Sequence, residues 1–257
     1  MQFLLEEVLA NDEFQSILGG LKLGMNEQLI TGLSDSARTM AMAALYRTMK
    51  RPLVVVTHND YHAQKLYDDL CEWLSEREVL LYPGSESIMA DFVRTDIEAQ
   101  GNRVQIHYRL ANGNFKVLVM PYSGLRRIVP PKSWVQTATI TFAADSEVPE
   151  RWLETLIRFG YERVDKVEDK GQFSIRGGII DIYPAHLSRP VRLELFDDEV
   201  ESIRTFTIED QRSVDKLTEI AVFPCQEWVI PEGKHMEVAE RIESALQQQL
   251  ARIKSKE

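Results

Sequence analysis

The sequence predicts an α/β chain that carries two kinds of sheet. In the first half, the apolar runs at residues 52–57 and 116–120 are typical of buried parallel strands, and helical segments separate them. After about residue 137, short strands of alternating polarity follow one another across tight turns, which indicates a small α+β domain with an antiparallel sheet. One amphipathic stripe over residues 236–253 then predicts a C-terminal helix.

These changes of pattern predict three parts: a parallel-sheet domain at residues 1–136, an α+β domain at 137–225, and a C-terminal helix at 226–257 that returns to the first domain. In the first part we expect helices at 1–18, 39–49, 62–74 and 96–112, and strands at 27–31, 52–57, 79–82 and 116–120. In the second we expect strands at 137–142, 162–167, 173–183, 191–196 and 200–208, and a helix at 149–159. Gly19 and Gly20 are expected to stop the first helix.

Composition excludes several classes of protein. The net charge of −10 argues against a broad surface for nucleic acid or membrane, because phosphate binding needs clustered cations. Cys71 and Cys225 lie far apart without metal-ligand spacing, which favours two free thiols in a reducing, cytoplasmic compartment. No apolar run approaches the roughly 20 residues of a membrane helix, so we expect no membrane partner.

Residues 32–39, GLSDSART, occupy the place of a phosphate-binding loop between an expected strand and an expected helix. Gly32 and Thr39 match the motif G-x-x-x-x-G-K-[ST], but Ala37 replaces its second glycine and Arg38 replaces its lysine. A Cβ at position 37 obstructs the close approach of phosphate, and the planar fork of arginine does not copy the compact charge of lysine. Asp35 adds a negative charge where a polyphosphate would lie.

The acidic half of a nucleotide site is also missing, because the strand at 116–120 runs into Pro-Tyr-Ser-Gly without Asp or Glu. We therefore predict no catalytic residue, no ATP hydrolysis and no cofactor. Two alternatives stay open for residues 32–39: a plain loop with a helix cap, or weak anion binding at the helix N-terminus. His58 and His62 have i, i+4 spacing but lack the H-E-x-x-H pattern, so we predict no metal site.

The strand at 191–196 has two unlike faces. Its aliphatic residues alternate with Arg192, Glu194 and Phe196, and a period of two places these three on the face away from the core. Arginine and large aromatic rings are residues that anchor protein interfaces. The alternative is a sheet whose second face is covered by a helix, with Phe196 in an ordinary core.

The runs RGGIIDIYP at 176–184 and VRLELFDDE at 191–199 resemble the UvrA-binding domain shared by UvrB and the bacterial transcription-repair coupling factors. In that family the matching arginines and phenylalanine contact UvrA. The resemblance therefore implies that Arg176, Arg192 and Phe196 bind UvrA. It also implies that Arg192→Ala or Phe196→Ala weakens this binding while leaving the fold intact.

The rest of the chain is more similar to the N-terminal, UvrB-like region of transcription-repair coupling factors than to UvrB. UvrB keeps an intact phosphate loop and a tyrosine-rich hairpin that clamps DNA, whereas residues 85–92 here contain few aromatics and little positive charge. The resemblance implies a degenerate P-loop-type domain at 1–136. It further implies that RNA polymerase and DNA bind other regions of the full-length protein, whose ATP-driven motor lies outside this chain.

Two rival functions remain open. One is a nucleotide-dependent, DNA-clamping repair protein of the UvrB type, which an intact Gly-Lys-Thr would have supported and Ala37-Arg38-Thr39 does not. The other is a module that associates with itself through the exposed face of its sheet.

Overall fold

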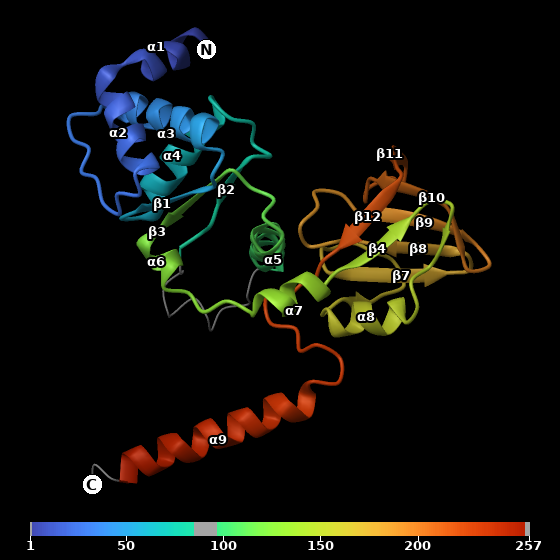
Figure 1. The fold of residues 1–257 in the computed structure, drawn as a ribbon. Coiled ribbons are helices and arrows are strands. Elements are labelled where there is room, and N and C mark those ends of the chain that lie inside the picture. Colours follow the sequence, from blue (N-terminus) through green and yellow to red (C-terminus); the bar gives the residue numbers. More distant parts are fainter. Residues whose placement is uncertain (1, 85–96, 255–257) are drawn as a thin grey trace. The chain divides into compact units, whose positions relative to one another are not determined.

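The computed structural model describes residues 2–84 and 97–254 and shows a mixed α/β protein with parallel and antiparallel sheets and a C-terminal helix. Its elements form two compact units, one of residues 1–93 with 112–128 and the other of residues 94–111 with 129–257 (Figure 1). The segment 85–92, where no DNA-clamping hairpin is expected, lies outside the described residues.

The first unit is built on a three-stranded parallel sheet of order β1-β3-β2. Its strands are β1 (Leu53–Thr57), β2 (Val79–Leu81) and β3 (Val117–Pro121), and the central strand β3 is buried along its whole length. Its helices are α1 (Gln2–Ala10), α2 (Asp12–Lys22), α3 (Asp35–Met49), α4 (Asp60–Cys71) and α6 (Tyr122–Leu125). Residues of α1 to α4 and of all three strands share one apolar core, so helix packing against the sheet holds this unit together.

Four sequence predictions for this unit are wrong. The N-terminal helix is interrupted at Asn11, whose side chain accepts a hydrogen bond from the Phe14 amide at 3.0 Å and caps α2. That second helix continues through the glycine pair predicted to stop it. Residues 27–31 form no strand, and helix α3 begins at Asp35 rather than at 39 because Ser34 caps it.

The second unit contains a seven-stranded sheet of order β11-β10-β9-β8-β7-β6, with β5 paired to β10. Its strands are β5 (Ser146–Glu147), β6 (Glu162–Arg163), β7 (Gln172–Arg176), β8 (Ile179–Ile182), β9 (Val191–Phe196), β10 (Glu199–Phe206) and β11 (Ser213–Leu217). All pairs are antiparallel except β6 with β7. A separate antiparallel pair joins β4 (Ile140–Ala143) to β12 (Glu219–Val222). The helices are α5 (Ile97–Ala111), α7 (Lys132–Thr137), α8 (Trp152–Arg158) and α9 (His235–Lys254).

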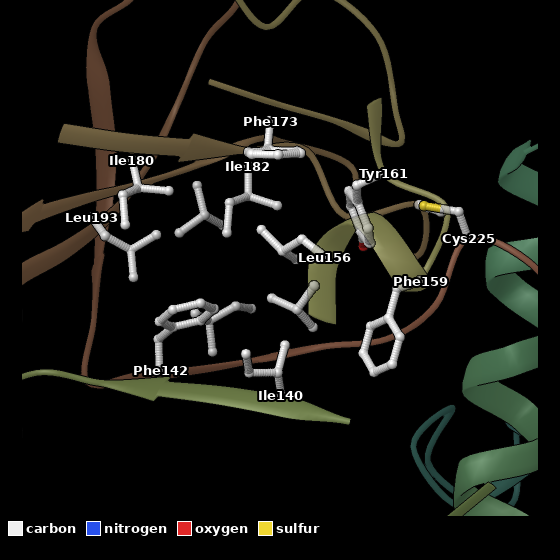
Figure 2. Close-up of a cluster of buried hydrophobic side chains, with 14 of the residues drawn as sticks. Ile140, Phe142, Leu156, Phe159, Tyr161, Phe173, Ile180, Ile182, Leu193 and Cys225 are labelled. Carbon is white, nitrogen blue, oxygen red and sulfur yellow. The ribbon is translucent and has the colours of Figure 1, made fainter. Parts of the chain in front are cut away.

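The core of this unit lies on one face of the seven-stranded sheet. Figure 2 shows Ile180, Ile182 and Leu193 pointing toward Ile140 and Phe142 of β4. These side chains are almost completely removed from water, and helix α8 contributes to the same cluster. Because alternate residues of a strand face opposite sides, this core fixes which residues of β8 and β9 point the other way.

Helix α5 is attached to the second unit by two close contacts. A Cβ added to Gly101 would come within 2.4 Å of the Ala185 side chain, so only glycine allows this approach. Arg103 and Glu227 form a buried ion pair at 2.5 Å.

Among the described residues, no helix is long and apolar enough to cross a bilayer.

A half-buried histidine is expected to make the stability of this unit depend on pH. The ring of His186 lies edge-on to Phe223 at 4.7 Å, and its Nδ1 has no hydrogen-bond partner in the described part of the chain. Burial, aided by the charge of Lys170, lowers the pKa of His186 to about 4.

The unfolded chain therefore takes up a proton on His186 below pH about 6.5, and the folded chain does not. We predict that His186 lowers the free energy of unfolding by up to about 3 kcal/mol as the pH falls from 6.5 toward 4. Urea unfolding at several pH values should show this slope in wild type and not in His186→Leu. Identical slopes in the two proteins would contradict the assignment.

Candidate functional site

The candidate site is the face of the seven-stranded sheet that turns away from the core. Val191 and Leu193 face the core, so Arg192, Glu194 and Phe196 lie on this outer face of β9. The pairing of β9 with β8 places Asp181 directly opposite Arg192. The predicted strand at 191–196 and its outward-facing set are thus confirmed by the structure.

Asp181 is a buried carboxylate shared by two arginines from the flanking strands. It is only 1% exposed. Arg192 donates from Nε to Oδ1 at 2.6 Å and from Nη2 to Oδ2 at 2.8 Å, and Arg176 of β7 donates from Nη2 to Oδ2 at 2.8 Å. A buried charge is stable only when it is paired in this way, and two-point contacts of this kind fix the orientation of the guanidinium.

The two arginines differ in how much of each side chain is accessible to a binding partner. Arg192 also donates to Gln211 at 2.9 Å and lies 4.5 Å from the centre of the Phe206 ring, so its side chain is only 16% exposed. The hydrogen bond with Asp181 raises the pKa of Arg192, which keeps it charged. The Arg176 side chain is 49% exposed. Arg192 is therefore largely committed to the sheet, and Arg176 presents its charge to solvent.

Phe196 stands at the end of β9 with 68% of its surface exposed. Asp197, with φ of 52°, and Asp198 then turn the chain into β10, so the acidic run at 197–199 closes a hairpin. The alternative that buries Phe196 in a core is wrong. A large exposed ring at a hairpin end has the character of an interface anchor.

Residues 32–39 lack the geometry of a phosphate site. Ser34 caps α3, and the Thr39 hydroxyl donates to the Ser36 carbonyl at 3.1 Å within the helix. Asp35 at the helix N-terminus accepts from Lys65 at 2.6 Å and lies 3.9 Å from Arg38. The hydrogen bond with Lys65 lowers the pKa of Asp35. A carboxylate of the protein is thus already paired with the cations that an anion would need.

Asp35, Arg38 and Lys65 line a cavity of about 500 Å³ in the first unit that the sequence did not predict. Its wall carries both signs of charge, together with His58 and His62, whose rings are 4.0 Å apart. Asn59 Oδ1 lies 2.8 Å from Nδ1 of His62. No group of three metal-ligating side chains is found among the described residues.

Sequence reasoning identified both arginines but missed the residue that joins them. The available signal was an isolated aspartate among isoleucines in a strand expected to be buried, because such a carboxylate needs a cationic partner. The roles of Phe206 and Gln211 depend on packing and loop conformation, for which the sequence carried no signal.

Comparisons with known proteins find relatives of this chain. The family model described as the UvrB interaction domain matches residues 140–228, which include the whole outer face described above. The chain is 41% identical over 246 residues to the transcription-repair-coupling factor of Bacillus subtilis (strain 168), covering 95% of this chain and 21% of that protein. The chain is similar to the N-terminal region of transcription-repair-coupling factors.

Other transcription-repair-coupling factors match similarly. The protein of Staphylococcus aureus (strain Mu50 / ATCC 700699) is 32% identical over 223 residues, covering 86% of this chain and 19% of the relative. The protein of Staphylococcus haemolyticus (strain JCSC1435) is 32% identical over 231 residues, covering 90% of this chain and 20% of the relative. The chain spans about a fifth of the length of these relatives and corresponds to their N-terminal region.

The shared carboxylate predicts different costs for losing each arginine. Arg192→Ala leaves Asp181 buried with one exposed partner, so we expect the free energy of unfolding to fall by about 3 kcal/mol. Arg176→Ala removes a half-exposed partner and should cost about 1 kcal/mol or less. Urea unfolding of the two variants beside wild type measures both values.

Arg192→Ala is therefore expected to destabilise the fold, in contrast to the expectation from sequence that it leaves the fold intact. Equal and small losses in the two variants would show that Arg192 is not the main partner of Asp181.

Proposed function

We propose that this chain is a non-catalytic recruitment module of transcription-coupled nucleotide excision repair, which binds UvrA through the outer face of β7 to β9. The exposed Phe196 beside the arginine pair held by Asp181 is the observation that carries the proposal. Its position inside the match to the UvrB interaction domain supports the choice of partner.

The three predicted contact residues have distinct parts in the proposed binding. Phe196 fills an apolar pocket of UvrA, since its ring is the large exposed apolar group at this end of β9. Arg176 pairs with an acidic or carbonyl group of the partner through the donors that Asp181 does not use. Arg192 contributes mainly by holding this face in one conformation before binding, which lowers the entropy lost on association.

The first unit is proposed to be a degenerate P-loop-type domain that serves as a scaffold and does not hydrolyse ATP. The parallel sheet, and helix α3 that follows Gly32 and contains Ala37, Arg38 and Thr39, support a relation to P-loop domains. The ion pair of Asp35 with Lys65 at the start of this helix supports the loss of nucleotide binding. Domain boundaries at 1–136, 137–225 and 226–257 belong to the same proposal. An ATP titration distinguishes the proposed scaffold from a nucleotide-dependent, DNA-clamping protein, because only the latter would bind ATP.

The activity of the full-length protein lies beyond this chain. Because the chain spans about a fifth of its relatives, we place the ATP-driven motor and the contacts with RNA polymerase and DNA in other regions of that protein. The proposed compartment is the cytoplasm.

Replacing Phe196 tests the proposal with little risk to the fold. We predict that Phe196→Ala lowers the affinity for UvrA about 30-fold, because truncating an interface anchor costs about 2 kcal/mol or more. Thermal unfolding should be nearly unchanged, since the ring is exposed. Binding is measured by sizing chromatography and by titration with purified UvrA.

Tyr122→Ala is the matched control, because Tyr122 is an aromatic residue of the first unit with 57% of its surface exposed. It should bind UvrA like wild type. If Phe196→Ala binds UvrA as tightly as wild type, the binding site lies elsewhere on the chain. If wild type does not bind UvrA, the proposed partner is refuted.

A further inference from the structure

The outer face carries a row of cations that extends beyond the three residues discussed above. The strand registers align Asp181 of β8 with Arg192 of β9, Arg192 with Arg204 of β10, and Arg204 with Lys216 of β11. Residues directly opposite each other in antiparallel strands lie on the same face with Cβ atoms about 5 Å apart. Three cations therefore stand side by side across three adjacent strands.

Such a row does not stabilise the sheet, because like charges directly opposite one another repel. The one carboxylate in the row, Asp181, is already shared by Arg176 and Arg192. Among the described residues, Arg204 pairs with Glu194 at 3.4 Å, and the Glu194 carboxylate also accepts a hydrogen bond from Ser202 at 2.5 Å.

The far end of the row is the least compensated. Lys216 is exposed on the edge strand and forms no ion pair within residues 2–84 and 97–254. The Arg204 side chain is 42% exposed. Uncompensated positive charge thus increases from β9 toward β11, away from Asp181.

We infer that Arg204 and Lys216 extend the binding face across β10 and β11 and contact an acidic segment of the protein partner. The inference rests on the proposed function, in which that partner is UvrA. Charge complementarity selects an acidic segment, and the exposed Phe196 on the same face of the sheet suits a protein pocket.

A protein partner is favoured over nucleic acid by the carboxylates around the row. Asp181 and Glu194 lie on the same face, and the chain carries a net charge of −10. A phosphate backbone would be repelled by these groups, whereas a protein can avoid them residue by residue.

Charge reversal tests this inference. Arg204→Glu and Lys216→Glu should each lower the affinity for UvrA about tenfold, mainly through slower association, because exposed cations at the edge of an interface steer the encounter. The affinity of wild type should fall with added salt, and that of the double variant should fall less. Surface-immobilised UvrA and a series of chain concentrations give both rates.

Two controls separate binding from folding. Arg163→Glu makes the same charge change at the opposite edge of the sheet, where Arg163 is aligned with the core residue Phe173, and should bind like wild type. Arg204→Ala should keep the wild-type melting temperature, because it relieves repulsion within the row, while still lowering the affinity. It replaces Arg204→Glu in the binding assay if the reversal fails to fold.

The outcomes of these experiments distinguish failure of this inference from failure of the proposed function on which it rests. If wild type binds UvrA and Phe196→Ala weakens binding, but the row variants bind like wild type, the inference is overturned and the proposed function stands. If wild type does not bind, both fail. If the reversals leave UvrA binding unchanged but abolish binding to a short fluorescent DNA duplex, the row is a nucleic-acid site and the inference is overturned.

Discussion

One buried carboxylate determines how the functional face of this chain is built. Asp181 lies on a central strand of an antiparallel sheet, where an unpaired charge would be prohibitively costly. The arginines on the strands to either side satisfy it, and in doing so they connect β7, β8 and β9 across the face that carries Phe196. The electrostatic requirement of the fold therefore also fixes the orientation of the side chains assigned to the partner.

The two faces of the seven-stranded sheet have different roles, one in packing and the other in the proposed binding. Period-two alternation sends the aliphatic residues of β9 into the core shown in Figure 2 and leaves the charged residues and Phe196 outside. The hydrophobic core then supplies the rigidity that a preformed binding face requires. On the outer face, cations accumulate toward β11 beyond what the neighbouring carboxylates neutralise, which the stability of the sheet does not explain.

Much of this arrangement could be predicted from sequence, because periodicity is a local property. The strand at 191–196 and its outward-facing residues followed from alternation alone. The shared role of Asp181 and the alignment of Arg204 with Lys216 depend on strand register, which a single sequence does not specify. The strand expected at 27–31 failed for a related reason: in the structure no neighbouring strand pairs with those described residues, and Leu29 is exposed.

The most direct test of the central claim is hydrogen exchange of the chain with and without UvrA. Amides of the hairpin at residues 196–199 and of the adjoining β9 and β10 should exchange more slowly in the complex, because the proposed interface covers this face. Amides of β1 to β3 in the first unit should be unaffected. Protection confined to the first unit, with the 196–199 hairpin unchanged, would contradict the account.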